Sequence, residues 1–253
     1  LLVSPHHKMP LTNTQHVHQT DQSQEYQRPS ELINVGSLNE AGIINDLKKS
    51  GFNDFSSLCE LIGNSIDARA RDIVFKTGMC KIRLIDNGVG MNQEKAANMF
   101  DLCRANHTND ESIGISGKGA KGATLRLSKQ KESYVFTSDG TKRLKITVPW
   151  DKIMEQHRYS NMITIEPMSD DEWEQFTSER KSIGNGVTGT TIVLPSTMDV
   201  YHEILDNFTD ARKKRTCNNR FDTVFGKFMI KMSLIDVNKP TNNSISLIQK
   251  VSD

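Results

Sequence analysis

A helical pattern with two chemically different sides, followed at once by two short strands, constrains what this chain can fold into. Apolar residues recur at helical spacing from a capping residue, Asn53, to Arg69. Strand patterns follow at residues 73–75 and 81–85. A helix that packs one side on a core and leads directly into strands is typical of α/β proteins.

The rest of the chain continues this mixture. A second helix is expected over residues 93–102, and a polar loop over 106–116 leads through glycines into a further helical stretch. The sequence SYVFTSDGTKRLKITVPW predicts a hairpin around Asp139-Gly140, and two more strands are expected at 162–166 and 190–194. We therefore predict an α/β two-layer sandwich, a sheet with helices on one face.

Composition narrows the class of protein. The 253 residues include 32 Lys and Arg against 31 Asp and Glu, a balance that favours neither a nucleic-acid nor an acidic partner. The cysteines show no CxxC spacing, so neither a zinc cluster nor a disulfide framework is indicated, and an intracellular setting, nucleus or cytoplasm, is expected. No apolar run approaches the roughly 20 residues of a membrane-spanning helix.

The helix expected over 53–69 has an unusual polar side. Glu60, Asn64 and Asp67 fall within about 60° of one another around the helix axis, opposite the apolar residues. A solvated face usually carries Lys, Arg and Gln, whereas this side includes Gly63, which costs about 1 kcal/mol in a helix relative to Ala. The stripe is either an outer face or a functional surface.

Asp86 ends an apolar strand in the stretch LIDNGVGM, residues 84–91, and two glycines follow it. A carboxylate at a strand end beside bare backbone is well placed to accept a hydrogen bond from a purine amino group. An ordinary Asp-Asn-Gly turn is the alternative explanation.

Glycines and lysines gather where a loop runs into a helix, in GISGKGAKGATLRLS at residues 114–128. Free backbone N–H groups and the helix dipole at such a junction attract phosphate, although a surface loop can look the same. The stretch lacks GxxxxGK[ST], so it is not a Walker loop. In TGTTIVLP, residues 188–195, small hydroxyl residues begin a late strand, which alone indicates only structure.

Taken in this order, the four stretches resemble the GHKL ATPases, the group that contains the DNA gyrase ATPase subunit, the ninety-kilodalton heat-shock chaperones, MutL and the MORC proteins. The resemblance covers residues 41–195. The matching motif residues, in chain order, are Glu60, Asn64 and Asp67; Asp86, Gly88 and Gly90; Gly117, Gly119, Lys121 and Gly122; and Gly189 with Thr190. The forms GKGAKGATLRLSK and DNGVGMNQEKAANM look most like MORC proteins, but Gly122 and Ala123 reverse the order of small residues expected there.

The resemblance implies a Bergerat ATP-binding fold with a mixed, mostly antiparallel sheet, and it implies roles. Glu60 would be the general base for the water that attacks the γ-phosphate, and Asn64 would hold Mg²⁺. Asp86 would read the adenine amino group with help from Thr190, and Lys121 would offset γ-phosphate charge. The backbone of Gly117, Gly119 and Gly122 would wrap the phosphates, and Asp67 would brace the site. The remaining nucleotide-binding residues would be Gly88, Gly90, Met91, Lys118 and Ala120.

Three segments are expected along the chain. Residues 1–40 are polar and poor in aliphatic side chains, which predicts a disordered tail, and the first residue, Leu1 rather than Met, suggests a fragment. The resemblance makes 41–198 the ATP-binding domain, with an ATP lid between Met91 and Ser116, and makes 199–253 the truncated start of a transducer-like domain.

The implied function is Mg²⁺-dependent ATP binding and slow hydrolysis that drive lid closure and dimerisation. The product would be a switch or clamp acting on a macromolecular partner, DNA or a protein client. Two alternatives stay open: a phosphotransferase of the histidine-kinase type, and an interaction module that binds nucleotide without cleaving it. The presence of Glu60 argues against the second alternative, because loss of that carboxylate would be its simplest signature.

Overall fold

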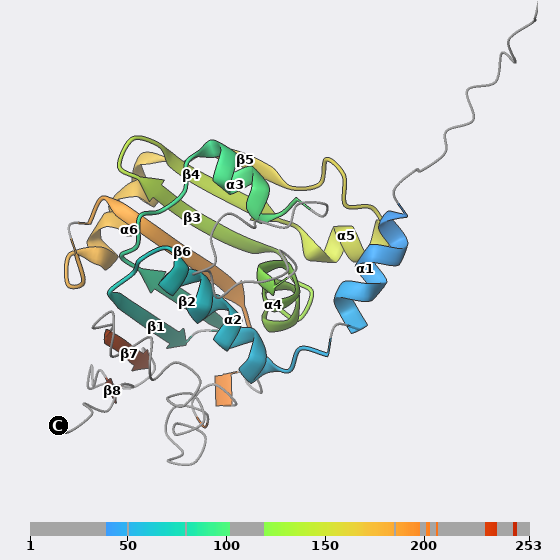
Figure 1. Ribbon diagram of the computed structural model, residues 1–253, viewed down its shortest axis with the longest axis horizontal. Helices are drawn as coiled ribbons and strands as arrows, with labels where there is room; N and C mark the ends of the chain where they lie inside the picture. Colours follow the sequence, from blue (N-terminus) through green and yellow to red (C-terminus); the bar gives the residue numbers. More distant parts are fainter. Residues whose placement is uncertain are drawn as a thin grey trace, which may run out of the picture. The chain divides into compact units, whose positions relative to one another are not determined.

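The computed structural model describes residues 39–49, 51–78, 80–101, 119–184, 186–197, 231–236 and 245–246, together with 201, 202 and 206. Its helices are α1 (Glu40–Lys49), α2 (Asp54–Asp67), α3 (Gln93–Met99), α4 (Gly119–Leu127), α5 (Trp150–Gln156) and α6 (Asp170–Arg180). Its strands are β1 (Asp72–Gly78), β2 (Lys81–Asp86), β3 (Ser133–Asp139), β4 (Arg143–Val148), β5 (Thr164–Pro167), β6 (Thr188–Pro195), β7 (Lys231–Asp236) and β8 (Ile245–Ser246) (Figure 1). The predicted α/β fold is confirmed.

The strands form one sheet in the order β5-β4-β3-β6-β2-β1-β7-β8. Neighbouring strands are antiparallel except for β1 and β7, which run parallel with Asp72 opposite Lys231. The sheet is thus mixed and mostly antiparallel, as the family resemblance implied. β6 comes late in the chain but lies between β3 and β2, and this places Thr190 opposite Asp86.

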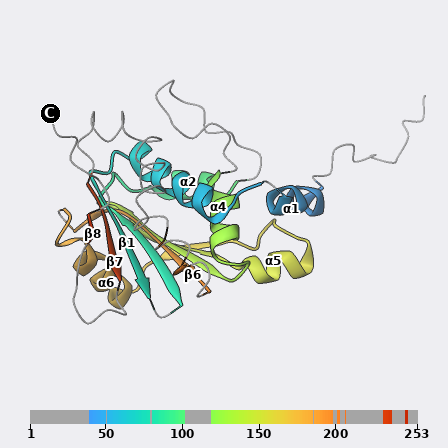
Figure 2. The same cartoon turned by 90° about the horizontal axis from the view of Figure 1, so that it is seen from below.

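The two faces of the sheet carry different helices. Apolar residues of α2 and α4 join strand residues in one core cluster that includes Leu58, Ile62, Leu84, Ala123, Leu127, Val135 and Ile192. The alternate strand residues Phe136 and Thr191, which pair with each other, belong to the opposite face. There they line a small pocket together with side chains of α6. Figure 2 shows α2 and α4 on one side of the sheet and α6 on the other. The helix layer predicted on one face is present, and α6 adds a helix on the second face.

The start of α2 is fixed by local and long-range contacts. Asn53 caps the helix, as predicted, by accepting a hydrogen bond from the Ser56 backbone N–H at 2.7 Å, while Ser56 Oγ accepts from the Asn53 backbone N–H at 2.9 Å. The buried carboxylate of Asp54 then binds Arg126 at 2.6 Å and Lys129 at 3.0 Å. Both cations lie at or just after the C-terminal end of α4, so these contacts hold α2 against α4.

Other expected elements appear with small changes. The helix expected over 93–102 ends at Met99, and residue 102 lies outside the described residues. The predicted hairpin is confirmed, and its turn is stabilised by Asp139 Oδ1, which accepts hydrogen bonds from the N–H groups of Thr141 and Lys142 at 2.8 Å. The strands expected at 162–166 and 190–194 are β5 and β6.

The segment predictions fall largely outside what the structure describes. The tail expected over residues 1–40 lies outside the described residues up to residue 38, and α1 begins at Glu40. Most of the expected lid, residues 102–116, also lies outside them. In the segment expected to begin a second domain, β7 and β8 continue the sheet of the preceding strands.

Candidate functional site

Helix α2 carries the polar stripe seen in the sequence. Glu60 and Asn64, one turn apart, are partly exposed, whereas Asp67 at the end of the helix is exposed. Leu58 and Leu61 are buried in the core. Two residues of the stripe can therefore face a ligand while the same helix packs on the sheet.

Gly119, the first residue of α4, lies directly against Glu60. A Cβ at this position would overlap the Glu60 carboxylate and stand 2.6 Å from its Cγ, so only glycine permits the approach. The first N–H groups of a helix have no partner inside it, and the helix dipole favours anions at that end. The candidate general base and the predicted phosphate-binding helix start therefore meet at one point.

The neighbouring residues of α4 are largely enclosed. Gly122 is buried and Ala120 is partly buried, and the Lys121 side chain is only 1 % exposed. Burial lowers the pKa of Lys121 to about 8, although the negative charge of Asp101 opposes this shift. Lys121 therefore gives up its proton far more readily than a surface lysine.

Asp86, at the end of β2, is buried and held by three hydrogen bonds. Its Oδ1 accepts from the backbone N–H groups of Gly88 at 2.9 Å and Thr190 at 3.0 Å, and its Oδ2 accepts from Ser65 Oγ at 3.0 Å. Burial raises the pKa of Asp86, and the hydrogen bond from Gly88 and the positive charge of Arg180 counteract part of that shift. The carboxylate is thus fixed in orientation, and Oδ2, with one bond from the described residues, can accept another.

A group of hydroxyls joins Asp86 to the loop that follows it. Thr137 Oγ1 accepts a hydrogen bond from the Met91 N–H at 2.9 Å, donates to the Gly189 carbonyl at 3.1 Å, and lies 3.3 Å from Thr190 Oγ1. Gly90 is buried with φ +66°, and a Cβ there would overlap the Ser138 carbonyl oxygen. These contacts fix residues 88–91 against β3 and β6.

Helix α2 connects the two halves of the site. Ser65 binds Asp86, and the carbonyl of Ala68 accepts a hydrogen bond from the Val89 N–H at 2.8 Å. Glu60 lies five residues before Ser65, about 8 Å along the helix axis. The structure therefore brings together Glu60, Gly119, Asp86, Gly88 and Thr190, whereas Gly117 and Lys118 lie outside the described residues.

Three residues near Asp86 were not predicted from the sequence: Ser65, Thr137 and Arg180. Ser65 lies inside the polar helix stretch, and a search for hydroxyls near the motif residues would have included it. Thr137 is one of many strand threonines, and no local signal marks it. Arg180 ends a highly charged helix, yet it is fully buried and donates to the Asp86 carbonyl at 3.1 Å.

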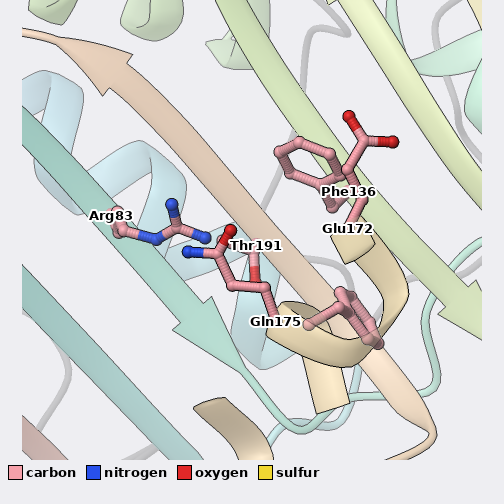
Figure 3. Close-up of a pocket in the computed structure, with 6 residues that line it drawn as sticks. Arg83, Phe136, Glu172, Gln175 and Thr191 are labelled. Atoms are coloured by element: carbon pink, nitrogen blue, oxygen red, sulfur yellow. The ribbon is translucent and has the colours of Figure 1, made fainter. Parts of the chain in front are cut away.

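A small pocket lies on the second face of the sheet, between α6 and the strands, and two of its lining residues, Phe176 and Thr191, contact Arg180. It is lined by Arg83, Phe136, Glu172, Gln175, Phe176 and Thr191 (Figure 3). None of these side chains belongs to the predicted site, and they pack α6 on the second face. Within the described parts of the chain, no group of three or more His, Cys, Asp or Glu residues could hold a metal ion, and no helix has both the length and the apolarity to cross a membrane.

The fold and this site define an α/β nucleotide-binding domain. A family model described as histidine kinase-, DNA gyrase B- and HSP90-like ATPase matches residues 53–182, slightly more than half of the chain. The chain therefore belongs to this family, and its domain binds ATP. No curated protein matches the sequence.

The residues present fit ATP. The Asp86 carboxylate can accept a hydrogen bond from an amino group, while the start of α4 offers backbone N–H groups beside a glycine with no room for a side chain. Asn64 provides a single amide oxygen, which suffices for Mg²⁺ when phosphates and waters complete its coordination. The matched range includes Glu60, Asn64 and Asp86, whereas Thr190 lies beyond it.

Proposed function

We propose that this protein hydrolyses ATP slowly in a Mg²⁺-dependent reaction and uses the nucleotide cycle as a switch. The observation that carries the proposal is the contact of Glu60 with Gly119 at the start of α4. A carboxylate at a phosphate-binding helix start is placed to orient a water toward the terminal phosphate. A module that only binds nucleotide has no need of this carboxylate.

Each residue of the site has a separate task in this proposal. Glu60 accepts the proton of the attacking water, and Lys121 offsets charge on the terminal phosphate. Asp86 accepts a hydrogen bond from the adenine amino group, supported by Thr190. Mg²⁺, held by Asn64 and the phosphates, would neutralise phosphate charge when bound. The backbone of Gly117, Gly119 and Gly122 would wrap the phosphates. Gly88, Gly90, Met91, Lys118 and Ala120 would also bind the nucleotide, and Asp67 would brace the site.

The segment between Met91 and Ser116 is proposed as a lid that closes over ATP while two copies of the domain pair. Because turnover is slow, the domain would stay in the closed, ATP-bound state for a long time, and this state would act on the partner. The MORC-like form of the two glycine motifs supports a clamp acting on DNA or chromatin. In size-exclusion chromatography with light scattering, a non-hydrolysable ATP analogue should convert the monomer to a dimer.

Phosphate release with Mg²⁺ and ATP, measured alongside ATP binding, tests the proposal. The native chain should turn over slowly, Glu60→Gln should bind ATP without turnover, and Asp86→Asn should lose binding. Gln matches the size of Glu and keeps the contact with Gly119, so a loss of turnover reports on the carboxylate alone. The exposed Glu155 of α5, changed to Gln, is the matched control and should behave like the native chain.

Other outcomes point to the alternatives. If the native chain binds ATP and Glu60→Gln turns over normally, Glu60 is not the base. Transfer of labelled phosphate to a histidine would then favour a kinase, and no chemistry at all would favour a passive binding module. If the full chain fails to bind ATP, the nucleotide proposal is wrong.

A further inference from the structure

Arg180 reaches Asp86 from the face of the sheet opposite the site. Its side chain is fully buried, and its Nε donates to the Asp86 main-chain oxygen at 3.1 Å. Nη2 donates to Thr191 Oγ1 at 2.9 Å and Nη1 to the Phe176 carbonyl at 2.9 Å, so all three guanidinium nitrogens donate a hydrogen bond. The guanidinium also lies 3.4 Å from the centre of the Phe176 ring. A buried arginine held this way has one orientation.

The backbone around Asp86 is shaped to admit this arginine. Gly189, beside Thr190 on β6, has φ +128°, and a Cβ there would overlap the Asp86 carbonyl and stand 2.9 Å from Arg180 Nε. Burial lowers the pKa of Arg180 to about 10, so the side chain remains charged at neutral pH. Gly189, with its positive φ, therefore leaves room for the buried, charged Arg180 to reach the carbonyl of Asp86.

The residue after Asp86 is also held from α6. Asn87 Nδ2 donates to the carbonyl of Ile183, just after α6, and to Asp72 Oδ2 at 2.9 Å. Asn87 Oδ1 accepts from the N–H groups of Arg71 and Asp72, both at 2.9 Å. The end of α6 and the residues just after it thus contact two consecutive residues, the main chain of Asp86 and the side chain of Asn87, where β2 passes into the loop of the site.

We propose that Arg180 is a positioning residue for the Asp86 carboxylate, so that α6 governs from the second face how selectively the site holds adenine. This rests on the proposed reading of the adenine amino group by Asp86. The carboxylate is joined to its own main chain by two bonds, so a small shift of the Asp86 carbonyl moves Oδ2 relative to the base. Directional hydrogen bonds weaken steeply when donor and acceptor are misaligned.

Binding of ATP and of inosine triphosphate, measured by calorimetry on the full chain, tests this proposal. Inosine has a carbonyl oxygen where adenine has its amino group, so it cannot donate a hydrogen bond to Asp86 from that position. The native chain should prefer ATP. Arg180→Met should weaken ATP binding about tenfold, equivalent to one lost hydrogen bond, while binding of inosine triphosphate changes by less than about twofold. Arg180→Lys, which keeps the charge but not the planar fork, should fall between.

The matched control is Glu179→Gln. It removes the neighbouring ion pair between α6 and β2, Glu179 Oε2 to Arg83 Nη2 at 3.0 Å, without touching Asp86, and should leave the ATP preference unchanged. Thermal unfolding verifies that each variant is folded. If Arg180→Met does not fold, Thr191→Val removes one acceptor of the guanidinium with little change in shape and should reduce the ATP preference about twofold.

Distinct results overturn the two proposals separately. If the native chain prefers ATP and the Arg180 variants keep that preference, the positioning role is wrong while the reading by Asp86 stands. Equal weakening of both nucleotides also rejects the positioning role, because it indicates general support of the site. If the native chain binds both nucleotides equally, Asp86 does not read the amino group and both proposals fail.

Discussion

The Glu60 carboxylate and the Cα of Gly119 are in such close contact that no side chain fits between them. Glu60 comes from the middle of α2 and Gly119 from the first turn of α4. Asp54 at the start of α2 forms ion pairs with Arg126 and Lys129, at or just after the C-terminal end of α4, and these ion pairs hold the two helices together. The position of the candidate base is therefore set by helix packing and not by a loop.

Gly119→Ala should abolish turnover while leaving the fold intact. The added methyl overlaps the end of a flexible side chain, so Glu60 moves instead of the backbone. ATP hydrolysis should fall by about 100-fold or more, the usual contribution of a general base. The double variant with Glu60→Gln should be no slower than Glu60→Gln alone, because both changes act through one carboxylate. Additive losses in phosphate release would show that Gly119 acts independently of Glu60.

ATP affinity should fall as the pH rises above about 8. The pKa of Lys121 is lowered by burial to about 8, and a nearby terminal phosphate would raise it again. Above pH 8, binding must then take up a proton, and the Kd for ATP should rise by up to about tenfold per pH unit. Fluorescence titrations at pH 7, 8 and 9 measure this slope.

The control for that slope is Lys121→Met, which should bind ATP more weakly at pH 7 and with no dependence between pH 7 and 9. ADP, which lacks the terminal phosphate, should give a shallower slope with the native chain. A flat ATP profile in the native chain would remove Lys121 from the phosphate site.

Asp86→Asn should be at least as stable as the native chain although it no longer binds ATP. The folded pKa of Asp86 is raised by burial, so its contribution to the free energy of unfolding falls as pH rises from its ordinary value of 3.8 through the folded value. Ionisation of the buried Asp86 carboxyl therefore costs the fold free energy of unfolding. An amide oxygen still accepts from Gly88 and Thr190. Urea unfolding at pH 7 checks the prediction, and a large loss of stability would contradict it.

Asp54→Asn should have the opposite effect. Burial alone would raise the pKa of Asp54, but hydrogen bonds from Arg126 and Lys129 outweigh it and lower the pKa below 3.8. The stabilisation is therefore complete above the unfolded pKa and is lost as pH falls through the folded pKa. At pH 7 the variant should lose about 2 kcal/mol of unfolding free energy in urea titrations.

The control for Asp54 is Asp151→Asn in the first turn of α5, where the side chain is exposed. It should change stability by less than about 0.5 kcal/mol. The difference between Asp54→Asn and the native chain should shrink as the pH is lowered past 3.8. A difference that does not depend on pH would show that Asp54 stabilises α2 by something other than its charge.

Much of the fold could be predicted because the signals are local. Asn53 and Ser56 cap α2 through neighbours three residues apart, and Asp139-Gly140 forms the turn of the hairpin with its own next residues. The helix α6 was not predicted. DDEWEQFTSER reads as a solvated segment, and its buried Arg180 is explained only by Asp86, 94 residues away. Contacts between distant segments leave no periodic pattern in either partner.

Some residues of the candidate site could likewise be predicted from local sequence, and others could not. Glu60, Asn64 and Asp86 stood out because short polar residues interrupted otherwise apolar helix and strand patterns. Ser65 and Thr137 did not, because a serine in a helix or a threonine in a strand is ordinary until its partner is known. The exposed position of Asp67 could not be predicted from the helix stripe either. The stripe gives the direction of a side chain around the helix axis but not how deeply that side chain is buried.

The central position of β6 bears on how the protein is made. β1 and β2 form one half of the sheet and β3 to β5 another, and these halves share no strand until β6 pairs with both β2 and β3. During synthesis on the ribosome, the edge of β2 therefore stays unpaired until β6 is made, while more than 100 further residues are translated. A piece ending at residue 182 would never close the sheet, so expressed versions of this domain need to extend at least to Pro195.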